Sequence, residues 1–148
     1  MRTRDVLEGR IGYQLKRAEH ALRVEMDGVL RGLGLTTPQY AVLSVLDDEP
    51  GLSGAALARR CFVTPQTMNQ IVAKLEKEAL ISRRAHPEHG RIRQAYLTER
   101  GEELVSRAHR DVEDVEERML AGFDSDERLD LLRTLSGLVD GLRSGEKP

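Results

Sequence analysis

Apolar residues recur every three or four positions along most of this chain, a spacing typical of amphipathic helices. The first such stripe indicates one long helix over residues 5–33, ended by the glycine-rich segment GLGL. Its apolar positions are Leu7, Ile11, Leu15, Ala18, Leu22, Met26, Val29 and Leu33. A helix of this length needs a surface against which to bury its stripe, and a partner chain is a natural candidate.

Three shorter helices follow, each with a recognisable start. A threonine and Pro38 open the helix over TTPQYAVLSVL, and Ser53 caps a short helix over GAALARRC. After the tight connection FVT, Thr64 caps a helix that has Pro65 at its first position. The inward face of this last helix is predicted to hold Met68, Ile71, Val72 and Leu75.

The period changes after Leu80. LISRRA and IRQAYLT have the composition of short strands, and the connection HPEHGR contains a proline and a glycine, so a β-hairpin is expected. Two helices joined by a tight turn and followed by a hairpin form a winged helix-turn-helix. The predicted fold is therefore mainly α with a small β-hairpin.

Two helices are expected after the hairpin. Thr98 opens a long one that runs to about Phe123, and Asp124 with Glu127 forms a capping box for the last one. The stripe of the long helix is Leu104, Ala108, Val112, Val115, Met119 and Phe123, with Val105 and Leu120 near its edge. The stripe of the last helix is Leu131, Leu132, Leu135, Leu138, Val139 and Leu142.

Composition limits the class of protein. A chain of 148 residues with 3% aromatic residues suits one compact unit with a core of Leu, Val, Ile and Ala. The sequence has no apolar run of the roughly 18 residues that span a bilayer, no apolar segment near its N-terminus and a single cysteine. We therefore expect a cytoplasmic protein with no membrane association.

Charge is distributed unevenly. The formal net charge is −2, but residues 53–98 carry 8 basic and 3 acidic side chains, between flanks of net −1 and −6. A basic middle is the electrostatic footprint expected of a segment that contacts phosphates, although a solvated basic face has the same composition.

The outer face of the helix that begins at Pro65 is rich in amides and hydroxyls. Flat side-chain amides match the edge of adenine in the major groove, and Lys74 suits a phosphate or guanine. The candidate contacts are Thr64, Gln66, Thr67, Asn69, Gln70 and Lys74. A plain polar surface is the alternative, and helix capping alone would explain Thr64.

Four arginines flank the hairpin: Arg83, Arg84, Arg91 and Arg93. Strand alternation would place Arg91 and Arg93 on one face, opposite Ile92. They can neutralise phosphates or enter a minor groove, but some of the four are equally suited to pair with the acidic stretch DVEDVEER.

Histidine and cysteine chemistry is weakly supported. His86 and His89 supply at most two metal ligands where a stable zinc site needs three or four, so no metal or other cofactor is expected. No combination of a nucleophile, a base and an orienting group can be identified in the sequence, so we do not expect an enzyme. Protonated His89 could touch a phosphate. Cys61 is better explained as a small buried hydrophobe than as a redox sensor.

These motifs resemble the MarR family of bacterial transcription factors over roughly residues 5–143. The most specific segments are LTTPQYAVLSVL, LSGAALARRCFVTPQTMNQIVAKLEKEALISRR and YLTERG. The resemblance implies a homodimer that binds double-stranded DNA at a pseudo-palindromic operator. It implies an N-terminal dimerisation helix (1–34), a winged helix-turn-helix (35–98) and C-terminal dimerisation helices (99–148).

The resemblance also assigns roles to residues. The recognition helix is 64–78, and Arg91 takes the place of a wing arginine that enters the minor groove. Arg84 and Arg93 are DNA-binding candidates from their positions beside the hairpin. The chain departs from the family at His89 and Gly90, where relatives carry an acidic and often a basic residue. A small phenolic or aromatic-acid effector is expected between the dimer helices and the DNA-binding region, near Tyr13, His20, Met26 and Tyr40.

The function expected from all of this is a ligand-responsive repressor. The alternative is a helical dimer whose winged region binds another protein, which an acidic recognition face would favour.

Overall fold

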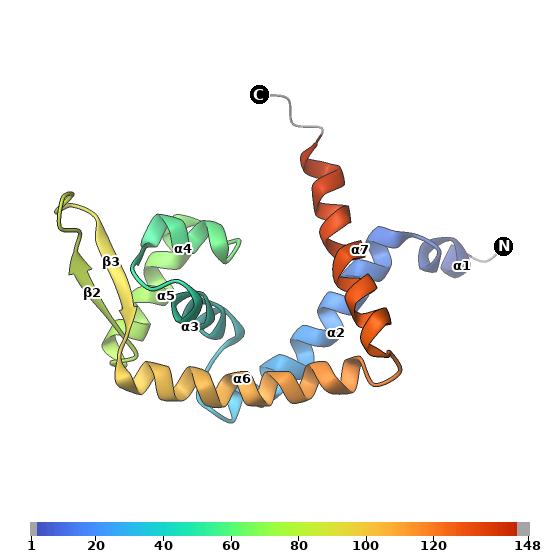
Figure 1. Ribbon diagram of the computed structural model, residues 1–148, viewed down its shortest axis with the longest axis horizontal. Coiled ribbons are helices and arrows are strands. Elements are labelled where there is room, and N and C mark those ends of the chain that lie inside the picture. Colours follow the sequence, from blue (N-terminus) through green and yellow to red (C-terminus); the bar gives the residue numbers. More distant parts are fainter. Residues whose placement is uncertain (1–2, 145–148) are drawn as a thin grey trace.

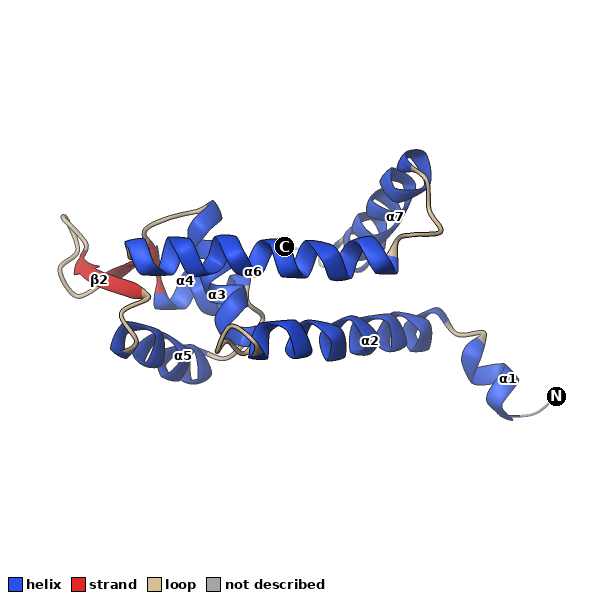
Figure 2. Ribbon diagram, turned by 90° about the horizontal axis from the view of Figure 1, so that it is seen from below, coloured by secondary structure: helices blue, strands red, loops and turns tan. Residues whose placement is uncertain are grey.

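The structure is a computed structural model that describes residues 3–144, most of which lie in helices (Figure 1, Figure 2). In chain order its elements are α1 (Thr3–Glu8), α2 (Ile11–Arg31), α3 (Thr37–Asp48), β1 (Leu52–Ser53), α4 (Gly54–Arg60), α5 (Pro65–Lys77), β2 (Ile81–Ala85), β3 (Arg93–Leu97), α6 (Glu99–Met119) and α7 (Ser125–Arg143). Within residues 3–144, no helix is both long and apolar enough to cross a membrane.

The single helix expected over residues 5–33 is in fact two helices. The chain leaves the helical conformation after Glu8, and Arg10 has the extended angles φ −91° and ψ 128° before α2 begins. Gly9 precedes the break, and glycine in a helix interior costs more backbone entropy than other residues. Gln14 Nε2 donates a hydrogen bond to the carbonyl of Glu8 at 2.7 Å, which satisfies one carbonyl group at the end of α1.

The remaining helix starts follow the sequence signals. Thr36 caps α3 in a reciprocal capping box with Gln39, and Ser53, Thr64 and Thr98 each accept a hydrogen bond from the third residue beyond them. Asp124 and Glu127 form the predicted capping box of α7. These caps fix where α3 to α7 begin, and so fix the turn between α4 and α5.

The hairpin belongs to a sheet of three strands in the order β1-β3-β2, all antiparallel. The hairpin itself is confirmed, with Ile81 paired to Leu97 and Ala85 to Arg93. The third strand was missed because β1 has only two residues, Leu52 and Ser53, which is too short to show a period of two. We call residues 37–97, which contain α3, α4, α5 and the sheet, the reading head.

The core lies where the reading head meets the middle of α6. Its fully buried side chains include Leu30, Leu43, Leu46, Leu57, Met68, Leu75, Ile81 and Val105. Val105, placed at the edge of the α6 stripe by the sequence, is completely buried, and Ala108 and Val112 follow it into the core. Gly101 lies so close to β2 that a Cβ atom there would be 2.0 Å from the carbonyl oxygen of Leu80.

The end of the molecule remote from the reading head exposes its apolar stripes. Figure 1 shows α7 standing away from the reading head at the far end of α6. Within the described part of the chain, α7 buries none of its residues, and Leu132 is 65% exposed. Ile11 of α2 is 67% exposed. A groove of about 620 Å³ between α2 and α7 is lined mainly by such apolar side chains, among them Leu15, Leu22, Leu135 and Leu138.

Candidate nucleic-acid interface

The helix α5 presents a polar face to solvent because its apolar face is fixed in the core. Met68, Val72 and Leu75 are buried, and Ile71 is half-buried. All six predicted contacts on this helix are exposed: Thr64, Gln66, Thr67, Asn69, Gln70 and Lys74. Within residues 3–144, no hydrogen bond occupies the amides of Gln66, Asn69 and Gln70. The amide donors and acceptors are therefore available to an external partner.

Thr64 is occupied as a helix cap. Its Oγ1 accepts from the backbone N–H of Thr67 at 3.1 Å and donates to the hydroxyl of Thr67 at 3.0 Å. Pro65 has no N–H, and the N–H groups of Thr67 and Met68 both bond to Thr64. Within the described residues, the N–H of Gln66 is therefore the group of the first turn left for a phosphate oxygen.

One of the four wing arginines is structural. Arg83 donates from Nε and Nη2 to the two carboxylate oxygens of Glu76, at 3.2 and 3.1 Å. These hydrogen bonds lower the pKa of Glu76. The partner of Arg83 therefore lies on α5 and not in the acidic stretch of α6, because β2 runs beside α5.

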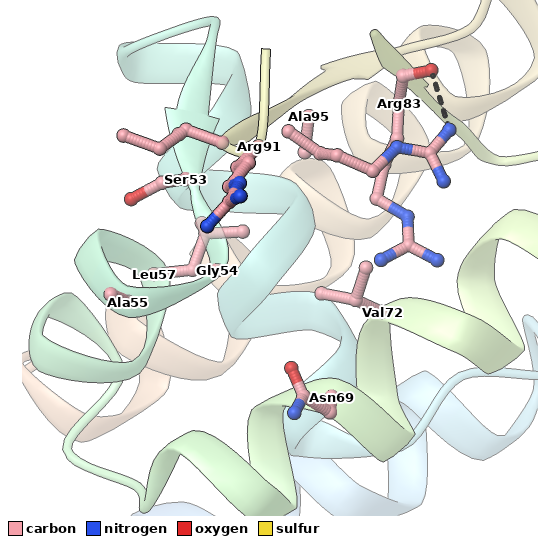
Figure 3. Close-up of a pocket in the computed structure, with 11 residues that line it drawn as sticks. Ser53, Gly54, Ala55, Leu57, Asn69, Val72, Arg83, Arg91 and Ala95 are labelled. Atoms are coloured by element: carbon pink, nitrogen blue, oxygen red, sulfur yellow. Dashed lines mark hydrogen bonds between the residues drawn. The ribbon is translucent and has the colours of Figure 1, made fainter. Parts of the chain in front are cut away.

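The guanidinium groups of the other three arginines make no ion pair in the described part of the chain. Arg84 lies over the ring of Tyr96, 4.7 Å from its centroid. Arg93 donates to the carbonyl of Arg83 at 3.4 Å, the dashed line in Figure 3. Arg84, Arg91 and Arg93 are all exposed. Their positive charge is therefore open to an anionic partner.

A cavity of about 350 Å³ joins the wing to the helix-turn-helix. Figure 3 shows Arg91 turned toward Ser53 and Gly54 at the start of α4, with Asn69 on α5 across the cavity. Arg83 and Arg93 border the same space. The wing arginines and Asn69 of the amide face of α5 thus border one cavity.

The predicted alternation of Arg91, Ile92 and Arg93 does not describe this surface. Arg91 and Ile92 lie in the turn before β3, where the period of a strand does not apply. Ile92 is 44% exposed and borders the cavity together with both arginines. The position of Arg91 is consequently set by the turn and not by the sheet.

The four residues predicted for an effector pocket are spread over the single chain. Tyr13 and His20 border a cavity of about 220 Å³ on the outside of α2. Met26 packs against the core, and Tyr40 donates a hydrogen bond to Nδ1 of His109 on α6. The sequence reasoning missed His109, although its position next to the buried Ala108 already placed it at the edge of the core.

Metal and thiol chemistry find little support in the geometry. Across residues 3–144, no three His, Cys, Asp or Glu side chains gather where a metal ion could bind. Cys61 is half-buried, and this burial raises the pKa of its thiol. A protonated thiol is a weak nucleophile.

Comparison with known proteins gives one family. The family model described as "MarR family" matches residues 33–92. The HTH-type transcriptional repressor Rv2887 of Mycobacterium tuberculosis is 40% identical over 128 residues, which are 86% of this chain and 92% of the relative.

Solved structures agree with that relationship. The structure of Rv2887 in complex with DNA matches with a TM-score of 0.73 at 37% identity, over 88% of this chain and 98% of that one. The structure of Rv2887 in complex with salicylic acid gives 0.72 at 39% identity, over 88% and 96%. The repressor CouR bound to a 23-mer DNA duplex gives 0.83 at 27% identity, over 90% and 94%.

Proposed function

This chain belongs to the MarR family, and on that premise we propose that it is a sequence-specific DNA-binding repressor that works as a homodimer and responds to a small ligand. One observation carries the proposal: Asn69, on the exposed amide face of α5, and the wing residues Arg91 and Arg93 border one cavity. The named relatives are transcriptional regulators, and two of them have been solved on DNA.

We assign base reading to α5 and phosphate contact to the wing and to the start of α5. Gln66, Asn69 and Gln70 can each offer a donor and an acceptor to a base edge in the major groove. Arg84, Arg91, Arg93 and Lys74 can neutralise phosphates, and Thr67 and Thr64 border the first turn of α5. Arg91, at the tip of the wing, is the residue suited to a minor groove.

A second copy of the chain is the partner that the exposed apolar stripes require. The stripes of α7 and of the first half of α2 face solvent in one chain, and exposed apolar patches of this extent mark interaction sites. The proposed division is a dimerising segment at residues 1–34, the DNA-binding region at 35–98 and a second dimerising segment at 99–148. A two-fold axis would present two copies of α5 to successive major grooves, about 10 base pairs apart.

We propose a small aromatic carboxylate as the effector class, because the relative Rv2887 has been solved with salicylic acid. Such a ligand lowers DNA affinity if it binds better to a dimer whose reading heads are wrongly spaced for the operator. Tyr13, His20, Met26 and Tyr40 stay the candidate contacts, to be brought together by the two chains of the dimer.

The experiment that tests the proposal is selection from a random library of DNA duplexes, followed by sequencing and footprinting of the enriched pool. We expect an inverted repeat protected over two half-sites. Gln70→Ala should relax the base preference at one position of each half-site, and Arg91→Ala should weaken binding to all sequences and reduce the salt slope by about one. Arg107→Ala, which removes an exposed arginine of α6, is the matched control and should leave both properties unchanged. A pool without any enriched sequence would overturn the proposal.

A further inference from the structure

The tip of the wing is closed by two backbone hydrogen bonds that one histidine ring accepts. Nδ1 of His86 accepts the backbone N–H of Glu88 at 3.1 Å and the backbone N–H of His89 at 3.2 Å. Pro87, between them, has no N–H to offer. The imidazole thus does what an aspartate or asparagine side chain does at the start of a turn, where it accepts from the backbone two residues on.

The same residue also closes the hairpin through its backbone. The N–H of His86 donates to the carbonyl of Ile92 at 2.8 Å, and the N–H of Ile92 donates to the carbonyl of His89 at 2.8 Å. Since the N–H of His89 is held by the His86 ring, the three bonds form a closed circuit. Gly90 and Arg91 are the two residues enclosed between His89 and Ile92.

This circuit determines where Arg91 stands. Arg91 lies outside β3, so the sheet does not set its backbone, and it makes no ion pair within residues 3–144. The backbone of Arg91 is held by the turn from His89 to Ile92, which the N–H of Ile92 closes on the carbonyl of His89. The N–H of His89 in turn donates to the His86 ring. Figure 3 shows the result, in which the guanidinium of Arg91 is directed into the cavity beside α4.

We propose that His86 is the positioning residue of the wing, and that its neutral ring holds the tip in the shape that presents Arg91 to DNA. The proposal rests on the DNA-binding function proposed above and adds a residue to it that contacts no DNA itself. An Nδ1 atom that accepts two N–H groups carries no hydrogen, so the proton of the neutral ring is on Nε2.

Protonation would reverse this arrangement. A hydrogen on Nδ1 would face the N–H groups of Glu88 and His89, and both hydrogen bonds would be lost. DNA binding through an ordered wing should therefore weaken in mild acid.

The ionisable groups around the ring must be separated from this effect. Glu88 and His89 belong to the same turn, and the rings of His86 and His89 have their centroids 5.1 Å apart. On the adjoining strands, Arg84 stacks on Tyr96, and Arg93 donates a hydrogen bond to the carbonyl of Arg83. The side chain of Arg83 pairs with Glu76. A charged His89 would attract phosphate and so strengthen DNA binding in acid, whereas protonation of His86 is expected to weaken it. His89→Ala is therefore the necessary control.

The test uses full-length protein and the DNA duplex that the parent enriches from a random library, at constant ionic strength, at about pH 8 and about pH 5.5. His86→Asn keeps an oxygen acceptor that does not titrate, and His86→Ala removes the acceptor. At about pH 8 we expect His86→Asn to bind within twofold of the parent and His86→Ala to bind about fivefold more weakly. At about pH 5.5 the parent and His89→Ala should fall about fivefold relative to His86→Asn. Equal affinity of parent, His86→Ala and His86→Asn at both pH values overturns the proposal.

A second measurement decides the question without DNA. In ¹⁵N–¹H spectra of the free protein, the His86 ring should carry its proton on Nε2, and the amide signals of Glu88 and His89 should move in His86→Ala and much less in His86→Asn. A proton on Nδ1, or amide signals that His86→Ala leaves in place, overturns the proposal. If the library yields no enriched duplex, the proposed function fails, while these spectra still decide whether His86 holds the turn.

Discussion

The hydroxyl of Tyr40 donates a hydrogen bond to Nδ1 of His109 over 2.7 Å, with the two rings meeting edge to face. Burial raises the pKa of Tyr40, so the hydroxyl keeps its proton. Asp47, on the other side of the ring, can only accept, so a neutral His109 ring has its proton on Nε2 and accepts the Tyr40 hydroxyl at Nδ1. This Nε2 lies 3.3 Å from Oδ2 of Asp47. This chain of contacts ties α3 of the reading head to α6.

Replacing Tyr40 by Phe should therefore lower the free energy of unfolding by about 1 kcal/mol, because it removes one half-buried hydrogen bond and keeps the ring. Urea denaturation at neutral pH and fixed protein concentration measures this. Tyr13→Phe is the matched control and should have no effect, because the Tyr13 hydroxyl makes no hydrogen bond within residues 3–144. Equal stability of both variants would show that the bond to His109 contributes nothing.

The burial of the Tyr40 hydroxyl predicts a loss of stability in alkali. The pKa of Tyr40 is raised in the folded state above its ordinary value of 10.0, so its contribution is complete below pH 10 and is lost as the pH rises through the folded value. Tyr40→Phe should flatten this alkaline decline. A decline of the same slope in parent and variant would assign it to other groups.

Gly101 is required by the contact between α6 and the start of β2. A Cβ atom at this position would lie 2.0 Å from the carbonyl oxygen of Leu80, which is backbone and cannot rotate away. Gly101→Ala should lower the free energy of unfolding by about 3 kcal/mol or more. Gly28→Ala, in the exposed interior of α2 with open space around it, should raise it by about 0.5–1 kcal/mol. Thermal and urea unfolding of the pair check this, and a Gly101→Ala protein as stable as the parent contradicts the packing described.

Phe62 is placed where a glycine would be less strained. It has φ +57° in the turn between α4 and α5, and its side chain is 89% exposed. Phe62→Gly should raise the free energy of unfolding by about 0.5–1 kcal/mol, because it relieves the left-handed backbone and gives up little buried surface. Phe62→Ala keeps the strain and should change little. If both variants are less stable than the parent, the exposed ring has a contact in the dimer. If Phe62→Gly is no more stable than Phe62→Ala, the left-handed backbone at this position is not strained.

The bidentate pair of Glu76 and Arg83 fastens the wing to α5. The pKa of Glu76 is lowered by the hydrogen bonds from Arg83, so the pair contributes above the ordinary carboxyl value of 4.5 and is lost as the pH falls through the folded value. Glu76→Gln should cost no more than about 1 kcal/mol at neutral pH, since both groups are partly exposed. The cost should shrink as the pH falls below 4.5 and through the lowered folded value. A cost that persists in acid would mean that packing and not charge holds the pair.

The sequence predicted the parts of this structure that depend on local chemistry. Caps at Ser53, Thr64 and Asp124 placed three helix starts, because a side-chain acceptor three residues before a free N–H is a local relationship. The apolar face of α5 identified its exposed face by elimination. The exposed polar face of α5 could therefore be predicted before the fold was known.

Features that depend on distant segments could not be predicted in this way. The partner of Arg83 on α5, the close approach of Gly101 to Leu80 and the pairing of β1 with β3 all join residues that only the fold brings together. The break between α1 and α2 was missed because the apolar period continues across it, while Gly9 and Arg10 end the helix. The contacts of His86 were missed because its ring accepts backbone N–H groups. Every residue except proline has such a group, so residue types alone do not reveal which one is bonded.

The central claim is that the surface formed by α5 and the wing reads DNA sequence, and fluorescence anisotropy tests it most directly. The full-length protein is titrated into the enriched duplex and into a duplex of the same composition in shuffled order, at about 50 mM and about 200 mM salt. We predict that the enriched duplex binds at least about a thousandfold more tightly, and that affinity for both falls steeply with salt. Equal affinity for the two duplexes, or binding that salt does not change, would contradict the claim.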